Sequence, residues 1–300
     1  MSTYDQTSLD NPEVAALGPS LKFSFANRRT MSNFIQTVIL WLLALIAAVP
    51  LISVLWMLIS RGGARLSLAL FTELPPAPME QGGGIGNAII GTLIMVAIGA
   101  LISIPVGVLG GIYTGMIAPR SRLSIAVRFI GKVLTGFPSI LAGLFVYAWL
   151  VVEMKTYSAI AGGLSLSILM LPTVLLTAEQ AFLMVPQRMK DAAYGMGCNP
   201  TQVALKIVLP TALPGVMTGV MLAVARASGE SAPILFTAAF SSYWLKSLTE
   251  PTASLSILIY NFTKLPYDNQ IQLAWSASLV LVLIVLVFNI LSRSFGGRRV

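Results

Sequence analysis

Long uncharged runs constrain this chain more than any other feature of its sequence. Five of them are each long enough to cross a bilayer: Thr30–Ser60, Gln81–Pro119, Val133–Val152, Thr156–Ala178 and Asn269–Ser292. A sixth, Ile207–Ala225, continues toward Phe240 through Arg226 and Glu230. A spanning helix needs about 20 mostly apolar residues. We therefore predict an all-α integral membrane protein with six spanning helices, at residues 34–59, 88–117, 133–152, 157–178, 212–236 and 271–292.

Composition supports this fold class and excludes several functions. Only 10% of the residues are charged, against about 25% in soluble domains. The chain has no histidine and one cysteine, Cys198, so we expect no metal site, no bound cofactor and no internal disulfide. The polar first 30 residues do not resemble a cleavable signal peptide. We predict a tail over residues 1–30 and one membrane domain over 31–300.

Lys and Arg near the helix ends set the expected orientation. Basic residues gather in the amino-terminal tail, in the second and fourth loops and in the carboxyl-terminal tail. They are Lys22, Arg28, Arg29, Arg120, Arg122, Arg128, Lys132, Arg188, Lys190, Lys206, Arg293, Arg298 and Arg299. The other three loops balance basic and acidic residues. Both termini and the loop over about 186–214 are therefore expected to be cytoplasmic.

Small residues in two spans predict close packing or bending. Gly107, Gly111 and Gly115 recur every four residues, which lets another helix approach closely in lipid. Gly136 and Pro138 stand near the start of the third span, where proline removes a backbone hydrogen bond. They predict a kink that serves either packing or a mobile hinge.

Arg226 and Glu230 fall within the fifth span. At about 1.5 Å per residue, Arg226 lies roughly 20 Å along a helix that starts near Ala212. An unpaired charge at such depth costs at least about 2.5 kcal/mol. The pair either neutralises itself to fix helix packing or forms a cationic station for an anion, with Ser228 and Ser231 adding hydrogen bonds. A planar guanidinium suits a tetrahedral oxyanion.

A polar, turn-rich stretch separates the fourth and fifth spans. It predicts a helix, a tight turn at Gly195 and Gly197, and a second short helix over about Asn199–Lys206, with Pro200 in its first turn. Its fixed pattern comprises Asp191, Ala192, Ala193, Gly197, Ile207, Leu209 and Pro210. A structured surface at this place is expected to dock a partner.

That pattern resembles the EAA loop of bacterial ABC importer permeases, with Asp191 where the motif has Glu. Further stretches resemble the A-type permease family of phosphate-specific (Pst) transporters. They are Leu66–Glu73 with the prolines and glycines after it, Phe137–Phe145 and Arg226–Ala238. The resemblance implies the type I importer (MetI-like) permease fold in the bacterial inner membrane. Some relatives carry an arginine at the place of Leu176, so Arg226 is expected to be the only cation inside the spans.

The resemblance also implies the function and partners. The chain would be one half of the pathway of an ATP-driven phosphate importer, beside a C-type permease, a cytoplasmic ATPase dimer and an external phosphate-binding protein. The chain contains no nucleotide-binding motif, so ATP and Mg²⁺ would bind the ATPase. Two long outer loops, Arg61–Gly86 and Ser241–Gln270, could receive the external partner or only join helices, and Leu255–Tyr260 could lie at the membrane surface. The alternatives are a permease for another oxyanion or small solute, a channel or secondary carrier without an ATPase, and, least favoured, an intramembrane enzyme.

Overall fold

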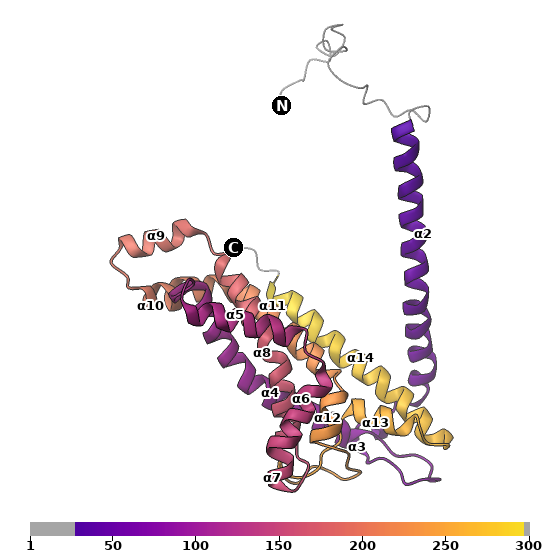
Figure 1. The fold of residues 1–300 in the computed structure, drawn as a ribbon. Helices are drawn as coiled ribbons and strands as arrows, with labels where there is room; N and C mark the ends of the chain where they lie inside the picture. The colour runs from indigo at the N-terminus through magenta and orange to yellow at the C-terminus, as the bar shows by residue number, and fades with distance from the viewer. Residues whose placement is uncertain (1–27, 297–300) are drawn as a thin grey trace. The chain divides into compact units, whose positions relative to one another are not determined.

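The computed structural model describes residues 28–296, and all the regular structure in that range is helical (Figure 1). The chain divides into two compact units, Met1–Trp56 and Met57–Val300. Within the described residues, five helices are long and apolar enough to span a membrane, and a strongly bent pair makes a sixth if it counts as one span. They are Arg29–Arg65, Gly86–Ile117, Ala159–Leu183, Pro200–Ser228 and Asp268–Leu291, with Arg122–Thr135 and Ser139–Met154 as the bent pair.

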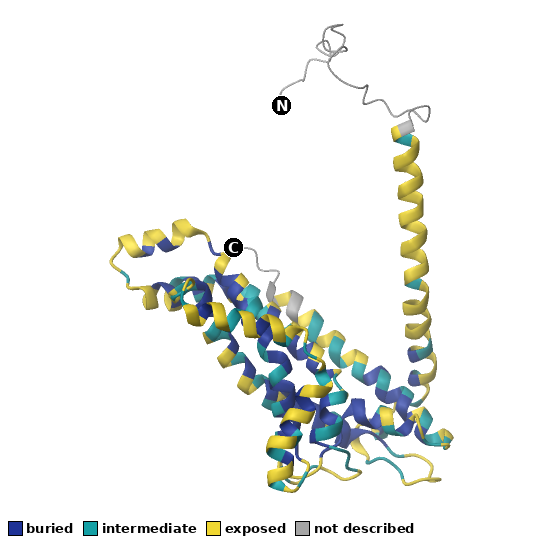
Figure 2. Ribbon diagram, viewed as in Figure 1, coloured by how far each residue is buried: buried dark blue, intermediate teal, exposed yellow. Residues whose placement is uncertain are grey.

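The first unit consists, in its described part, of helix α2 (Arg28–Met57). Its side chains are exposed along nearly the whole helix (Figure 2), including Trp41 and Trp56. An apolar surface all round a helix is suited to lipid. The predicted tail over residues 1–30 lies outside the described residues, apart from its last three residues, which begin α2.

Helices α4 (Gly86–Ile112) and α8 (Ala159–Leu183) pack along each other at the centre of the second unit. The stripe of small residues explains the close approach, because a Cβ placed on Gly107 or Gly111 would lie 2.9 Å from Cβ of Val174 or Ala178 respectively. The packing prediction is therefore confirmed for Gly107 and Gly111, whereas Gly115 is buried but leaves room for a Cβ. Helix α4 runs on into the π-helical turn η4 (Tyr113–Ile117), as the predicted span 88–117 requires.

The third predicted span is bent. Helix α5 (Arg122–Thr135) ends before Gly136, and α6 (Ser139–Val146) begins after Pro138, with 107° between the two directions. The π-helical turn η5 (Tyr147–Val151) and α7 (Val152–Met154) complete it. The prediction of one helix over 133–152 is wrong at its start, whereas the kink at Gly136 and Pro138 is confirmed. A hinge motion there stays a prediction.

The fifth predicted span is also interrupted. One helix runs over Pro200–Ser228, and its longest α-helical part is α11 (Leu209–Ser228). A continuous helix over 212–236 is therefore a wrong prediction. The chain breaks at Gly229–Ser231 and restarts as α12 (Ala232–Thr237), with Pro233 in its first turn. Glycine weakens a helix and proline cannot donate to the preceding turn, so these residues stop α11.

Several loops and short helices of the second unit gather at one end, opposite α9 and α10, which we call the loop end (Figure 1). It contains the π-helical turn η2 (Leu58–Gly62), the short turn η3 (Gly63–Arg65), α3 (Leu68–Thr72), the loop over residues 73–85, the loop over 238–254 and α13 (Leu255–Phe262). Helix α14 (Asp268–Gly296) starts there. The expectation that Leu255–Tyr260 lies at the membrane surface is wrong, because Leu255, Ile257 and Leu258 are buried in the core.

Candidate functional site

Arg226 and Glu230 meet where α11 ends. Nε of Arg226 lies 3.7 Å from Oε1 of Glu230, and their side chains are 56% and 18% exposed. The predicted pairing therefore occurs, although Glu230 lies beyond the helix end and not on the same helical face. The guanidinium accordingly keeps much of its surface open, and it donates no hydrogen bond to any residue in the range 28–296.

The break that carries Glu230 is fixed on two sides. Its backbone oxygen accepts a hydrogen bond of 2.8 Å from Oγ of Ser256 in α13. Beyond the break, α12 packs so closely on α6 that a Cβ on Gly143 would lie 2.6 Å from Cα of Pro233. These contacts from neighbouring helices, and not a continuation of α11, place Glu230 beside Arg226.

The two serines predicted to assist Arg226 behave differently from each other. Ser228 is 2% exposed and its hydroxyl donates to the carbonyl of Val224 at 2.8 Å. This hydroxyl proton is used within the helix, and the role of Ser228 toward an anion stays a prediction. Ser231 is exposed at the break, and its role stays a prediction.

The segment over residues 187–210, here called the elbow, joins α8 to α11. Helix α9 (Gln187–Gly195) carries Asp191, which accepts a 2.9 Å hydrogen bond from Nε2 of Gln187. Ala193 is buried, whereas Ala192 and Asp191 are exposed. Gly197 has a φ of +85°, a left-handed conformation that favours glycine. The predicted turn is therefore confirmed at Gly197, whereas Gly195 is the last residue of α9.

The second half of the elbow starts as expected and ends differently. The side chain of Asn199 accepts from the backbone of Gln202 at 2.8 Å, and the side chain of Gln202 accepts from the backbone of Asn199 at 2.9 Å. The two residues form a complete capping box, with Pro200 at its first helical position. The π-helical turn η6 (Val203–Val208) follows the short α10 (Pro200–Gln202) and leads straight into α11. A separate short helix over Asn199–Lys206 is therefore a wrong prediction.

The remaining motif residues lie where the elbow joins the membrane helix. Ile207 and Leu209 are half-buried and pack against the core, and Pro210 is exposed. Pro210 stands in the first turn of α11 and so does not end a helix.

A buried ion pair that we did not predict lies near the carboxyl end of α8. Nε of Arg128, in α5, contacts Oε1 of Glu179, whose side chain is 4% exposed. Arg128 also donates to the carbonyl oxygens of Pro119 at 2.8 Å and Thr114 at 2.6 Å. Arg226 is therefore not the only cation packed among the spans. The sequence did contain one indication of this ion pair. Glu179 stands at the edge of an uncharged run, and an acidic residue at such a place requires a partner.

Lys190 is the other residue that the sequence did not single out. It is 7% exposed, and its ammonium donates to the carbonyl oxygen of Phe182, in the last turn of α8, at 3.3 Å. Burial lowers the pKa of Lys190 below its ordinary value of 10.5, and neighbouring Asp191 partly opposes this shift. The cation lies at the negative end of the α8 dipole and joins the elbow to α8.

The apolar helices are those of a membrane-spanning protein, and comparison with known proteins identifies its class as a permease. Residues 107–298 match the family described as "binding-protein-dependent transport system inner membrane component". The methionine ABC transporter MetNI has a similar fold, with a TM-score of 0.57 and 22% identity, covering 71% of this chain and 93% of that one. A bacterial importer of the polysaccharide alginate gives a TM-score of 0.52 at 15% identity, covering 92% and 99%.

Curated relatives identify the narrower family. The phosphate transport system permease protein PstA of Yersinia pestis is 37% identical over 271 residues, covering 90% of this chain and 92% of that protein. The PstA of Haemophilus influenzae is 38% identical over 242 residues, covering 81% and 86%. The probable PstA of Methanocaldococcus jannaschii is 34% identical over 260 residues, covering 86% and 91%. This chain therefore belongs to the PstA family of ABC transporter permeases, which are multi-pass subunits of the inner membrane.

Proposed function

We propose that this chain is a permease subunit that carries inorganic phosphate inward through an ATP-driven importer. The relatives that match most of its length are named for phosphate transport. The observation that carries the proposal within the chain is Arg226, whose side chain is 56% exposed beside a break between two helices. A half-open guanidinium at such a break can accept a tetrahedral oxyanion in its planar fork.

Glu230 moderates this site. A carboxylate 3.7 Å from Nε is too far for a direct hydrogen bond, yet close enough to reduce the positive potential. Phosphate would thus bind weakly enough to leave, which conduction requires. A self-neutralising structural pair remains the competing explanation for the same two residues, and Ser231 is the nearby hydroxyl available for a further hydrogen bond.

The importer also requires partners. A second, C-type permease would supply the other half of the pathway, and a cytoplasmic ATPase dimer would bind ATP and Mg²⁺. An external phosphate-binding protein would deliver the substrate. The bias of Lys and Arg supports cytoplasmic termini and a cytoplasmic elbow, so the loop end would face outward.

The elbow would seat on the ATPase. Its exposed apolar side chains, Met189, Tyr194, Met196 and Leu205, suit a protein groove. Closure of the ATPase dimer on ATP would then tilt the helices between inward-open and outward-open arrangements.

The direct test is uptake of radiolabelled phosphate in cells whose own phosphate importers are deleted and which express the complete transporter. Arg226→Gln should abolish most of the uptake at an unchanged amount of membrane-inserted protein, and Arg226→Lys should retain a part because it keeps the charge. Wild-type uptake by Arg226→Gln would support the purely structural pair. Equal competition by sulfate would indicate a permease for another oxyanion.

A purified subunit that moves phosphate without any ATPase would instead indicate a channel or carrier. The assay therefore includes proteoliposomes containing this chain alone, with and without the ATPase and the second permease.

A further inference from the structure

Ser256, in the first turn of α13, holds the backbone of Glu230 in place. Ser256 is 8% exposed, and its Oγ donates a 2.8 Å hydrogen bond to the carbonyl oxygen of Glu230. The backbone amide of Glu230 donates to the carbonyl oxygen of Ala227 at 3.2 Å. Both backbone groups of Glu230 therefore have partners, and the bond to Ser256 ties this residue to a different helix.

A buried chain of hydrogen bonds supports the hydroxyl of Ser256. This hydroxyl has one proton, which it gives to Glu230, so the 3.1 Å contact between Oγ of Ser256 and Oγ of Ser254 is a bond that Ser254 donates. Ser254 is fully buried, and its Oγ accepts in turn from the backbone amide of Ile257 at 3.2 Å. Successive hydrogen bonds polarise and strengthen one another. The hydroxyl of Ser256 is therefore oriented toward the break between α11 and α12.

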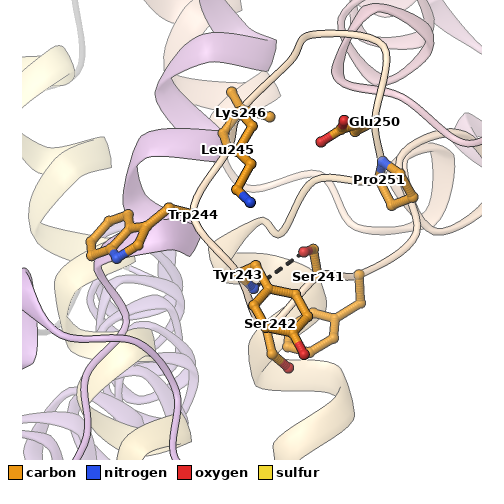
Figure 3. A pocket seen from close by; sticks show the side chains of 9 residues that line it. Ser241, Ser242, Tyr243, Trp244, Leu245, Lys246, Glu250 and Pro251 are labelled. Atoms are coloured by element: carbon orange, nitrogen blue, oxygen red, sulfur yellow. Dashed lines mark hydrogen bonds between the residues drawn. The ribbon is translucent and has the colours of Figure 1, made fainter.

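The start of α13 is in turn tied to α4. The backbone amide of Leu255 donates to Oγ1 of Thr92, a buried residue of α4, at 2.9 Å. The loop that leads from α12 to α13 is fixed to α4 as well, because Nδ2 of Asn87 donates to the carbonyl oxygen of Ser241 at 2.9 Å. Figure 3 shows this loop at the pocket that it lines, with the 3.2 Å hydrogen bond from the backbone of Tyr243 to Oγ of Ser241. The break is thereby anchored to α4 through α13.

Arg226 lies on the other side of the break and has no such anchor. It stands in the last turn of α11, and its side chain is 56% exposed and donates no hydrogen bond to any residue of the described range 28–296. Gly229, between the two charged residues, is not held by close packing, because a Cβ there would lie 3.7 Å from the carbonyl oxygen of Arg226. The separation of Arg226 from Glu230 therefore depends on the anchor at Ser256.

This separation decides whether the guanidinium is available to an anion. Nε of Arg226 lies 3.7 Å from Oε1 of Glu230, beyond the range of a hydrogen bond. A shift of about 0.8–1 Å would convert the contact into a charge-assisted hydrogen bond, which is roughly twice as strong as a neutral one. An anion would then have to displace the carboxylate before it could bind.

We propose that Ser256 is a positioning residue for the passage of phosphate. By holding the carbonyl group of Glu230, it keeps the carboxylate from closing onto Arg226, so that the guanidinium stays open to the anion. This role rests on the proposed function, which supplies phosphate as the anion that Arg226 meets.

The first test measures the guanidinium directly and does not depend on transport. The complete transporter is treated with phenylglyoxal, which modifies accessible arginines, and the modification of Arg226 is followed by mass spectrometry. Ser256→Ala should slow this modification about twofold to tenfold, the range expected from one hydrogen bond. Arg122, an exposed arginine of α5, is the internal control and should react at the same rate in both proteins. An unchanged rate at Arg226, or no reaction of Arg226 in the wild type, would overturn the proposal.

The second test is phosphate uptake by proteoliposomes that contain the complete transporter, measured against the concentration of phosphate-loaded binding protein. Ser256→Ala should lower the maximal rate about twofold to tenfold. The half-maximal concentration should not change, because buried Ser256 does not reach a docked protein. A wild-type maximal rate would overturn the positioning role and leave the phosphate importer intact. A wild-type transporter that takes up no phosphate would instead reject the proposed function.

Two comparisons separate positioning from a merely structural role. Ser254→Ala removes the N-cap of α13 but keeps the bond from Ser256 to Glu230, so it should lower the melting temperature more than Ser256→Ala and the maximal rate less. Uptake losses that simply follow the melting temperatures would overturn the proposal.

The hydroxyl itself is tested by two variants of equal shape. Ser256→Thr keeps the hydroxyl and should retain most of the maximal rate, whereas Ser256→Val lacks it and should lose as much as Ser256→Ala. This pair also decides the question if Ser256→Ala does not reach the membrane. Equal rates for the threonine and valine variants would show that the hydrogen bond to Glu230 has no part in transport.

Discussion

The buried pair between Arg128 and Glu179 allows a quantitative prediction, because its two members differ in burial. The side chain of Glu179 is 4% exposed and that of Arg128 is 26% exposed. Arg128→Leu leaves an isolated buried carboxylate and should cost about 3–5 kcal/mol of stability. Glu179→Leu leaves a cation that reaches water and still bonds to the carbonyl oxygens of Pro119 and Thr114. It should therefore cost less, about 1.5–3 kcal/mol for one charge-assisted hydrogen bond.

The double variant Arg128→Leu with Glu179→Leu discriminates between pairing and independent effects. Replacing both members of a buried pair by apolar residues is often neutral, so the double variant should be more stable than Arg128→Leu alone. The assay is thermal unfolding of the purified transporter, followed by tryptophan fluorescence in one detergent, for the four members of the cycle. Arg122→Leu, an exposed arginine of the same helix, controls for the loss of a positive charge. A double variant no more stable than Arg128→Leu would refute the reasoning.

Three further predictions concern the glycine stripe and the elbow. Gly111→Ala should destabilise the chain by about 1–3 kcal/mol, since its Cβ would lie 2.9 Å from Cβ of Ala178, whereas Gly115→Ala finds ordinary contacts from 3.4 Å and should be tolerated; melting temperatures compare the two. Gly197→Ala should cost about 1 kcal/mol of stability because Gly197 has a φ of +85°. It should also uncouple ATP hydrolysis from phosphate uptake, whereas Gly195→Ala, within helix α9, should leave the two coupled. Parallel ATPase and uptake assays test this, and normal uptake by Gly197→Ala would contradict a docking role for this turn. Lys190 has a lower pKa in the folded chain than when unfolded, so the unfolded chain binds more protons just below pH 10.5 and stability should rise with pH in that window. Lys190→Met should remove this rise in melting temperature, whereas Lys206→Met, at an exposed lysine, should keep it. An identical rise in both variants would exclude Lys190 as its source.

Local patterns predicted the elements that depend on local chemistry. The span predicted at 88–117 agrees within two residues with Gly86–Ile117, because an uncharged run has few alternatives to a membrane helix. Spacing alone indicated the packed face of Gly107 and Gly111, and glycine alone indicated the left-handed turn at Gly197. Each of these features is decided by the residue itself and its neighbours in sequence.

The errors arose where a distant residue decides the structure. The fourth span runs past Ala178 to Leu183 because Glu179 is paired with Arg128, 51 residues earlier in the chain. The fifth is stopped by Gly229 and Pro233, but the direction of the chain after the break depends on contacts with α13 and α6. Residues 255–258 are buried because α4 and α14 cover them. The pattern of charge and hydropathy along the sequence does not show which distant residues come into contact.

The same distant contacts suggest how the elbow could act on the rest of the fold in the proposed importer. Lys190 donates a hydrogen bond to the last turn of α8, and Arg128 forms an ion pair with Glu179 one turn earlier. A displacement of α9 would therefore pull on α8 and, through Arg128, on α5, which ends at the bend before Pro138. The helix over Pro200–Ser228 is continuous, so it carries the elbow's other half to Arg226 over roughly 40 Å at about 1.5 Å per residue. The elbow is thus connected through α8 and α5 to the bend, and through the continuous helix to Arg226; we call these connections the two routes. Movement of the elbow should therefore change the angle at Gly136–Pro138 and the position of Arg226 together. Distances between spin labels across the bend and beside Arg226, measured with and without ATP, should consequently change in the same transition, and a change at one place alone would mean that the two routes are not coupled.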